Sequence, residues 1–139
     1  MVYLNNAATT VTKPENYYTA SKASLDETKL KLAELLGCRN GEKIVLTDSG
    51  SSALKAAIES FTEPGDHIIS TDMEYGCVSD VISQRCDIGC SVTYIPLNEY
   101  GTVRYDMVES AVNERTKAII CCHGSNVTGN IADLSLIHI

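Results

Sequence analysis

The chain has 139 residues, enough for one domain with a hydrophobic core, and 44% of its residues are hydrophobic. Its formal net charge of −7 and the lack of a basic stripe exclude nucleic acid and anionic membrane surfaces as main partners. No apolar run approaches the length of a membrane span, and no basic-then-apolar signal pattern is present. We therefore expect a cytoplasmic protein that binds neither nucleic acid nor membrane.

Six cysteines raise the question of disulfides or a metal site. Reduced thiols are expected, because no secretion signal is present. No Cys-x-x-Cys pair occurs, and Cys121 and Cys122 stand in an apolar, strand-like run, in which neighbouring side chains point to opposite faces. The pattern favours buried structural thiols, since free cysteine behaves as a small hydrophobe. We predict no metal site.

Helices and strands are predicted to alternate along most of the chain. Residues 15–36 favour a helix with a leucine-rich face, and Gly37 is its natural C-terminal stop. The patterns that follow predict strands at 43–47, 67–71, 91–95 and 117–122, and helices at 51–61, 76–86 and 105–114. This alternation is typical of an α/β fold with a mostly parallel sheet covered on both faces. Ligands bind such sheets at the carboxyl ends of the strands, so the segments after the strands are informative.

Small polar residues join the first predicted strand to its helix, with the sequence TDSGSSAL at 47–54. A helix N-terminus exposes unpaired N–H groups and the positive end of the helix dipole. Small residues let a phosphate approach these groups, and serine hydroxyls add donors. An ordinary N-cap explains the same residues, because Ser, Asp and Gly commonly begin helices. The joint alone leaves both interpretations open.

Polar residues also follow the later strands. Tyr75 could stack on a flat ring, or be a half-buried loop tyrosine. Asn126 could donate to a ligand oxygen, or cap a turn ahead of Gly129. For His123 a structural role is favoured over that of a general base, because no carboxylate partner is visible. The dinucleotide, P-loop and serine-hydrolase motifs are absent from the sequence, and a phosphate site, a stacking ring and a ring-oxygen donor together describe pyridoxal phosphate.

Four motifs in order resemble the class V aminotransferase and cysteine desulfurase family of pyridoxal-phosphate enzymes. The family's N-terminal YLDNAATT is similar to YLNNAATT, with Asn5 in place of the acid. Its strand, phosphate loop and helix resemble IVLTDSGSSALKAAI, its strand before the ring-stacking residue resembles PGDHIISTDMEYGCV, and its H-x-S-N-x-x-G resembles HGSNVTG. The resemblance spans almost the whole chain. It implies an incomplete three-layer α/β/α large domain of a fold-type-I PLP-dependent transferase, with a mostly parallel sheet.

The resemblance implies four cofactor-binding residues and no catalytic one. Gly50 and Ser51 would hold the phosphate of pyridoxal 5'-phosphate (PLP) through backbone N–H groups and a hydroxyl. The same segment would then both cap the helix and bind the phosphate. Tyr75 would stack over the pyridine ring, where desulfurases usually carry a histidine that is also credited with proton transfer. Asn126 would hydrogen-bond the phenolic oxygen of the ring.

Several family motifs have no match in this sequence. Relatives carry the aspartate beneath the pyridinium nitrogen and the Schiff-base lysine in Asp-x-x-Gln and His-Lys motifs that follow SNVTG. The desulfurase cysteine, the carboxylate-binding arginine and a small C-terminal domain come later still. A stretch that helps to build the dimer is also shorter near the N-terminus here. We therefore expect the 139-residue chain not to catalyse desulfuration by itself.

The last six residues, LSLIHI, resemble the translated end of a transposase adapter used in sequencing libraries. Relatives continue at this point with an acidic amphipathic helix, and the alternative is a genuine apolar tail. We expect three parts: an N-terminal segment at 1–20, a partial PLP-binding large domain at 21–133 and an adapter artefact at 134–139.

The parent protein that the resemblance implies is a homodimer that acts on an amino acid, with sulfur transfer from cysteine as the leading reaction. Transamination or a lyase reaction on another amino acid is the alternative. Two rivals are a flavodoxin-like module, which would retain flavin, and a non-catalytic scaffold remnant. In relatives the strand at 43–47 lies at a sheet edge beside strands that have no match here. We therefore expect the chain to be poorly packed, or to pair this strand with a non-native neighbour.

Overall fold

The computed structural model describes residues 22–38 and 41–137, which fall into two units that meet between Thr47 and Asp48. The first unit contains helix α1 (Lys22–Leu35) and the short 3-10 helix η1 (Gly41–Lys43). No helix in these described residues is both long and apolar enough to cross a membrane.

Helix α1 ends where the sequence predicts. Gly37 has a φ of 69°, and Cys38 N donates a hydrogen bond to Ala33 O at 2.7 Å. Together with the bond from Gly37 N to Glu34 O, this is a Schellman motif, which favours glycine in the left-handed conformation. Ala33 is buried, but Leu35 of the predicted leucine-rich face is 80% exposed. The predicted helical residues 15–21 lie outside the described ones.

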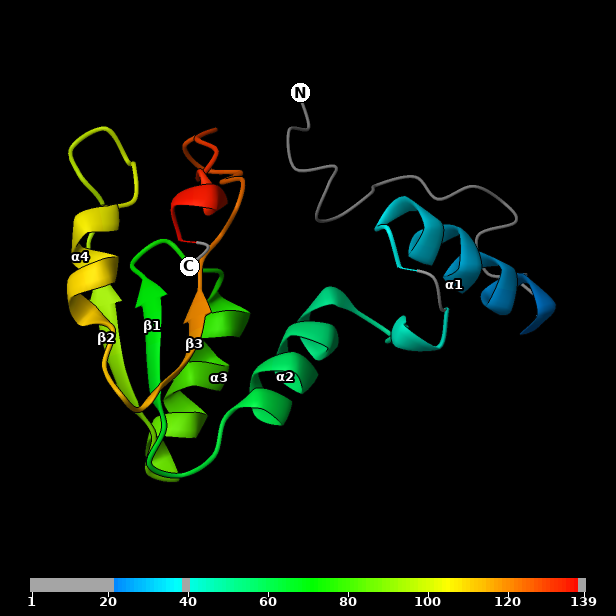
Figure 1. The fold of residues 1–139 in the computed structure, drawn as a ribbon, viewed down its shortest axis with the longest axis horizontal. Helices are drawn as coiled ribbons and strands as arrows, with labels where there is room; N and C mark the ends of the chain where they lie inside the picture. The colour runs from blue at the N-terminus through cyan, green and yellow to red at the C-terminus, as the bar shows by residue number, and fades with distance from the viewer. Residues whose placement is uncertain (1–21, 39–40, 138–139) are drawn as a thin grey trace, which may run out of the picture. The chain divides into compact units, whose positions relative to one another are not determined.

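The second unit is a three-stranded parallel sheet with helices (Figure 1). Its elements are α2 (Gly50–Phe61), β1 (His67–Thr71), α3 (Gly76–Asp87), β2 (Ser91–Ile95), α4 (Tyr105–Ala111), β3 (Thr116–Ile120) and the 3-10 helix η2 (Leu134–Leu136). The strand order is β2-β1-β3, and a helix lies between each pair of consecutive strands. The predicted α/β fold is confirmed.

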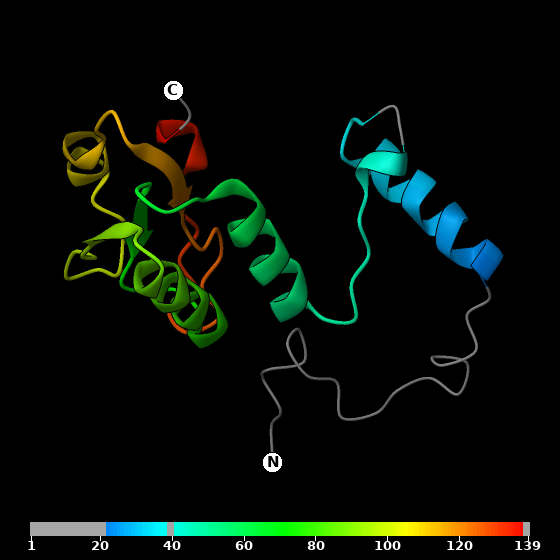
Figure 2. The same cartoon turned by 90° about the horizontal axis from the view of Figure 1, so that it is seen from below.

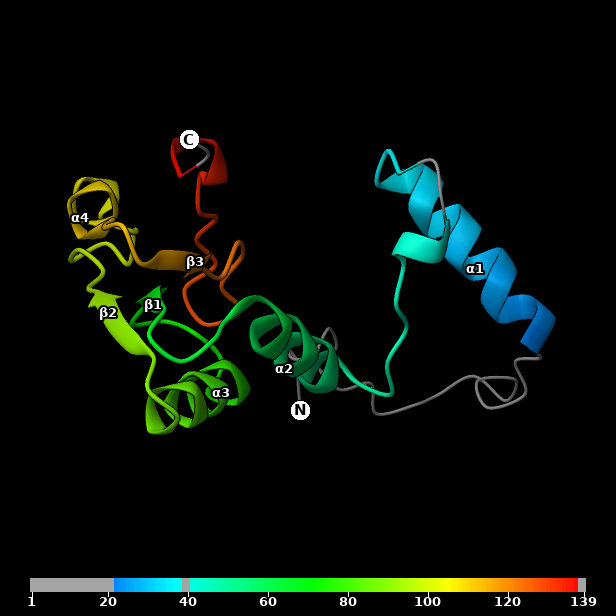
Figure 3. The same cartoon turned by 60° about the horizontal axis from the view of Figure 1, so that its bottom comes forward.

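Hydrophobic clusters cover both faces of the sheet. Figures 2 and 3 show that α3 and α4 lie on opposite sides of the sheet. On the side of α2 and α3, the buried cluster consists of Ile58, Val78, Val81 and Ile82. On the side of α4, it consists of Ile69, Ile95 and Val108. Consecutive residues of the central strand β1 are therefore buried, which is typical of a parallel sheet covered on both faces.

Residues 43–47 form no strand, so that prediction is wrong. Lys43 belongs to η1, and the residues from 44 to 47 have no regular structure. Val45 is 77% exposed, although its side chain suits a buried strand. A strand needs backbone partners on a neighbouring strand, and in the described residues the sheet consists of β1, β2 and β3 alone. Of the two expected outcomes, non-native pairing of this segment does not occur.

Two further elements end earlier than predicted. The helix predicted at 105–114 ends at Ala111, and the strand predicted at 117–122 runs from Thr116 to Ile120. The strands predicted at 67–71 and 91–95 have the bounds of β1 and β2. The end of β3 before Cys122 matters for the site, because the backbone N–H of Cys122 then binds a partner outside the strand pairing.

Candidate functional site

The first turn of α2 carries the small polar joint. Ser49 is the N-cap: its Oγ accepts a hydrogen bond from Ser52 N at 3.1 Å, and its backbone O accepts one from Ala53 N at 3.0 Å. Gly50 and Ser51 are exposed, and a Cβ added to Gly50 would meet nothing within 4 Å. The capping interpretation is confirmed, and the open space leaves the first amides of α2 accessible to an anion.

Tyr75 lies in the turn between β1 and α3, at the carboxyl end of the central strand. It occupies the N-cap position of α3, and its carbonyl oxygen accepts from Val78 N at 2.8 Å and from Ser79 N at 3.1 Å. Its side chain is 44% exposed. The backbone of Tyr75 therefore begins the helix, while the ring remains accessible to a flat ligand.

Asn126 lies in the turn after β3, and Ser125 is the residue that caps this turn. The Oγ atom of Ser125 accepts from Val127 N and Thr128 N, both at 3.2 Å. Gly129, with a φ of 76°, closes the turn through a bond from its N to Ser125 O at 2.9 Å. The alternative that Asn126 caps the turn is therefore wrong, and its side chain is exposed.

Glu74 joins the Tyr75 turn to the Asn126 turn. Its Oε1 atom accepts a hydrogen bond from Thr71 Oγ1 at 2.6 Å and a second one from Cys122 N at 2.8 Å. The hydroxyl of Ser125 also donates to Met73 Sδ at 3.5 Å. The structure thus brings two of the predicted site segments together. The sequence analysis missed Glu74, although an acidic residue directly before Tyr75 in a post-strand turn is a usable signal.

The loop after β2 joins the same edge of the sheet. Asn130 Nδ2 donates to Tyr100 O at 2.7 Å and to Gly101 O at 3.1 Å. Between the three loops lies a hollow of about 20 Å³, lined partly by Met73 and Cys122. A hollow of this size has room for about one water molecule, so a cofactor ring would lie on the surface of these loops.

Gly50 and Ser51 reach this edge through the direction of α2. Figure 1 shows that α2 runs opposite to the strands, so its first turn lies toward the end of the sheet at which the strands finish. The short link from the end of α2 to His67 requires this orientation. Packing of Ile58 against α3 holds the helix in place. Helix packing therefore links Gly50 and Ser51, the predicted phosphate-binding residues, to the two turns.

His123 is exposed, and its backbone O accepts from Ala132 N at 2.7 Å. A structural role of its backbone is consistent with the favoured interpretation. In the described part of the chain, no group of three or more His, Cys, Asp or Glu residues is arranged to hold a metal ion.

All six cysteines are free thiols, and only Cys90 is fully buried. Burial, followed by the charges of Glu74 and Cys122, raises the pKa of the Cys121 thiol from its ordinary value of 9.0 to about 11. Burial also raises the pKa of Cys86, with contributions from Cys90 and Asp87. These two thiols stay protonated at neutral pH, so neither is activated as a nucleophile.

The raised pKa of Cys121 predicts a loss of stability in alkali. The folded thiol holds its proton more tightly than the unfolded one, so its contribution to stability is complete below about pH 9 and is lost as the pH rises toward 11. Urea unfolding at about pH 8 and about pH 10 measures this loss. The variant Cys121→Ala should show a smaller loss than the unaltered chain. An equal loss in both would exclude Cys121 as its source.

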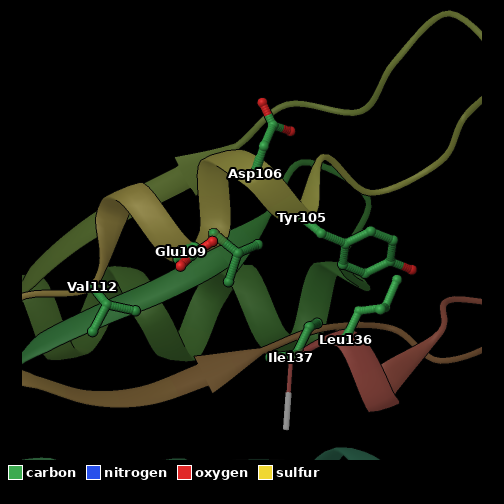
Figure 4. A pocket seen from close by; sticks show the side chains of 7 residues that line it. Tyr105, Asp106, Glu109, Val112, Leu136 and Ile137 are labelled. Atoms are coloured by element: carbon green, nitrogen blue, oxygen red, sulfur yellow. The ribbon is translucent and has the colours of Figure 1, made fainter. Parts of the chain in front are cut away.

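Another hollow lies away from these turns, beside α4 (Figure 4). It has a volume of about 440 Å³ and is lined by Tyr105, Asp106, Val108, Glu109, Val112, Leu136 and Ile137. Two of these residues belong to the segment 134–139, which the sequence analysis expects to be an adapter artefact. The lining shares no residue with the turns of Tyr75 and Asn126, so the hollow is separate from the candidate site.

Comparisons with known proteins identify a family and relatives of this chain. The model of the family "Aminotransferase class-V" matches residues 2–138. The chain is 24% identical over 139 residues to the "Probable cysteine desulfurase, mitochondrial" of Dictyostelium discoideum, and the match covers 98% of the chain and 31% of that relative. It is 33% identical over 91 residues to the "Cysteine desulfurase IscS" of Pseudomonas fluorescens (strain SBW25), which covers 66% of the chain and 22% of the relative. The solved structure "SspA in complex with cysteine" has a TM-score of 0.73 at 22% identity and covers 96% of the chain and 41% of that structure.

The chain belongs to the class-V aminotransferase family, because the family model covers almost all of it. The resemblance predicted from the four sequence motifs is confirmed. The chain spans less than half of the length of the relatives above.

Proposed function

We propose that this chain supplies the phosphate-binding and ring-binding part of a PLP-dependent enzyme that transfers sulfur from cysteine. The observation that carries this proposal is the junction of the Tyr75 and Asn126 turns through Glu74, at the carboxyl edge of the sheet. The names of the relatives, which describe cysteine desulfurases, support the reaction. A relative solved in complex with cysteine supports an amino acid as the substrate. The resemblance further supports a cytoplasmic homodimer.

The described residues fit the cofactor at three points. The open first turn of α2 offers the amides of Gly50 and Ser51, and the Ser51 hydroxyl, to a phosphate. The accessible ring of Tyr75 would cover one face of the pyridine, and the exposed amide of Asn126 would donate to its phenolic oxygen. When bound, PLP supplies an electron sink for bond cleavage next to the substrate nitrogen.

One residue favours the alternative of transamination or a lyase reaction on another amino acid. Tyr75 stands where the resemblance to desulfurases implies a histidine with a role in proton transfer. A phenol is a poor substitute for an imidazole in moving a proton at neutral pH. If the full enzyme needs a proton carrier at this place, its reaction differs from that of the desulfurases.

Binding of PLP to the 139-residue chain tests the proposal. We expect equilibrium dialysis to show saturable PLP binding that Tyr75→Ala and Asn126→Ala each weaken by about fivefold to tenfold, the value of one stacking or hydrogen-bonding contact. Tyr100→Ala is the matched control, because Tyr100 is a 76% exposed tyrosine of the loop after β2. Retention of flavin mononucleotide without PLP binding would instead support the flavodoxin-like rival.

Catalysis by the chain alone is tested in the same preparation. We expect no sulfide from cysteine and PLP beyond the rate without protein, because no lysine of the sequence lies in a His-Lys motif. Sulfide release that scales with protein concentration would contradict this expectation.

A further inference from the structure

We propose that Glu74 is the positioning residue of this site, because its carboxylate fixes the turn of Tyr75 against the turn of Asn126. The proposal rests on the proposed function, since it assigns Glu74 a role in shaping the PLP-binding surface. Glu74 lies outside the four residues that the resemblance implies, and its role follows from the hydrogen bonds of one oxygen atom.

The side chain of Glu74 accepts a hydrogen bond just beyond the point where the backbone pairing of β1 and β3 stops. The strands β1 and β3 pair as far as Ser70 and Ile120, so in the same register Thr71 would pair with Cys121 and Asp72 with Cys122. The chain after β1 turns away at this point, so Cys122 N donates to Glu74 Oε1 at 2.8 Å. The carboxylate oxygen therefore takes the place of a strand carbonyl. A side chain thereby anchors the first residues of the Asn126 loop.

The hydroxyl of Thr71 orients this carboxylate. Thr71 is the last residue of β1 and is 5% exposed, and its Oγ1 donates to the same Oε1 atom at 2.6 Å. Hydrogen bonds to a carboxylate are short and about twice as strong as neutral ones. Because the threonine is buried in the central strand, the position of Glu74 is set by the rigid sheet.

The hydrogen bonds that Glu74 accepts set the positions of both residues that would bind the ring. Tyr75 follows Glu74 directly in the chain, and Asn126 lies four residues after Cys122. A second side-chain hydrogen bond between these turns runs from Ser125 Oγ to Met73 Sδ at 3.5 Å, and thioether sulfur is a weak acceptor. Loss of the carboxylate would therefore let the turns separate, although Tyr75 and Asn126 themselves remain.

The effect of Glu74 on Cys121 gives a second sign of this arrangement. The carboxylate is one of the charges that raise the pKa of the Cys121 thiol, after burial. Cys121 directly precedes the residue whose amide Glu74 binds. The negative charge of Glu74 thus faces the start of the Asn126 loop.

The variants Glu74→Ala and Glu74→Gln in the 139-residue chain test the proposal. Glutamine keeps the Oε1 acceptor, whereas alanine removes it. We expect Glu74→Ala to speed amide hydrogen exchange at Cys122 and at residues 124–129 and to weaken PLP binding by about tenfold, the value of a hydrogen bond to a charged group. Glu74→Gln should restore PLP affinity to within about threefold of the unaltered chain, since a neutral acceptor retains part of the bond.

Asp72→Ala is the matched control, because it removes an exposed carboxylate from the same turn. It should change neither exchange at 124–129 nor PLP affinity. Exchange at Ile68 and Ile69, in the central strand, distinguishes local loosening from unfolding. If Glu74→Ala unfolds the chain, amide exchange in Glu74→Gln and in Asp72→Ala is compared instead to test the role of Glu74. Faster amide exchange at Cys122 in Glu74→Gln than in Asp72→Ala supports the positioning role of Glu74. Equal exchange at Cys122 in the two variants overturns that role.

The two readouts separate this inference from the proposed function. If the unaltered chain binds no PLP, the proposed function fails, and exchange at Cys122 still decides whether Glu74 braces the turns. If the chain binds PLP but Glu74→Ala matches Asp72→Ala in both exchange and affinity, the positioning role of Glu74 is overturned. Faster amide exchange at Cys122 in Glu74→Ala, together with an unchanged PLP affinity, would also overturn the positioning role of Glu74.

Discussion

Replacement of His67 by alanine is expected to lower the free energy of unfolding by about 2–4 kcal/mol, the combined cost of a cavity and of lost buried hydrogen bonds. His67 is the first residue of the central strand and is 5% exposed. Its Nε2 lies 2.8 Å from Thr93 Oγ1 on β2, and its Nδ1 lies 2.9 Å from Thr116 Oγ1 on β3. One ring therefore joins all three strands at the amino end of the sheet.

The neighbouring Asn113 determines which ring nitrogen carries the proton. Its Oδ1 accepts from Arg115 N at 2.9 Å, which fixes the orientation of the amide. Its Nδ2 consequently donates toward His67 Nδ1 at 3.0 Å. The ring then accepts at Nδ1 and donates from Nε2 to Thr93, so it is neutral in this arrangement. Alanine would leave the amide and both hydroxyls without this partner.

Urea unfolding of the 139-residue chain measures the effect of His67→Ala as a change in midpoint at constant slope. Thr93→Val is the matched control, since it removes one hydrogen bond and keeps the shape of the side chain. We expect this control to cost about 1 kcal/mol. If His67→Ala costs no more than Thr93→Val, the ring does not join the three strands as the structure indicates.

The sequence predicted the central part of the fold well, because local patterns determine it. The strands β1 and β2 begin and end where predicted, since short apolar runs are bounded by turn residues such as Pro64-Gly65-Asp66. The stop of α1 at Gly37 was predictable from the need for a positive φ. In each case the deciding interaction is made by residues close together in the chain.

The elements that were predicted wrongly depend on hydrogen bonds that the hydrophobic pattern of the segment does not show. Residues 43–47 have a strand-like pattern, but a strand also needs a neighbour, and the local sequence does not specify one. The helix predicted to 114 ends at Ala111, because Asn113 binds Arg115 N and Thr116 N through its side chain and backbone. Asparagine competes in this way with helical hydrogen bonds.

The sequence predicted where the residues of the candidate site lie in the fold, but it predicted only part of the contacts between their turns. Strand alternation places Tyr75 and Asn126 at the carboxyl edge of the sheet, and the structure joins their turns there. The connection depends on Glu74, whose partner Cys122 is 48 residues away. A pattern read along the chain cannot select this partner, because Cys122 was expected to continue β3. The roles of the four cofactor-binding residues stay predictions.

Replacement of Arg85 by methionine is expected to lower the free energy of unfolding by about 2–3 kcal/mol, because it removes two hydrogen bonds from a charged group. Arg85 lies in the last turn of α3, and its Nε donates to Thr62 Oγ1 at 2.9 Å. Its Nη2 donates to the backbone oxygen of the same residue. Thr62 is the C-cap of α2, is 1% exposed, and donates to Ile58 O at 2.7 Å.

The charge of Arg85 lies at the C-terminal end of α2, where a cation is favoured by the helix dipole. This contact holds the end of α2 against α3, whereas Gly50 and Ser51, the residues proposed to bind the phosphate, lie at the opposite end of the same helix. Methionine keeps most of the apolar stem, so the variant tests the hydrogen bonds more than the packing. We expect amide exchange to increase in the last turn of α2.

Lys55→Met is the matched control for Arg85→Met. Lys55 lies on α2 and forms an ion pair with Glu59 at 3.9 Å, and their side chains are 51% and 41% exposed. Exposed pairs of this kind contribute little, so we expect a change within about 0.5 kcal/mol. Urea unfolding of both variants provides the comparison. A loss in Arg85→Met as small as that in Lys55→Met would show that α2 is held by apolar packing alone, and the orientation of its first turn would then depend on Ile58 and the α3 cluster.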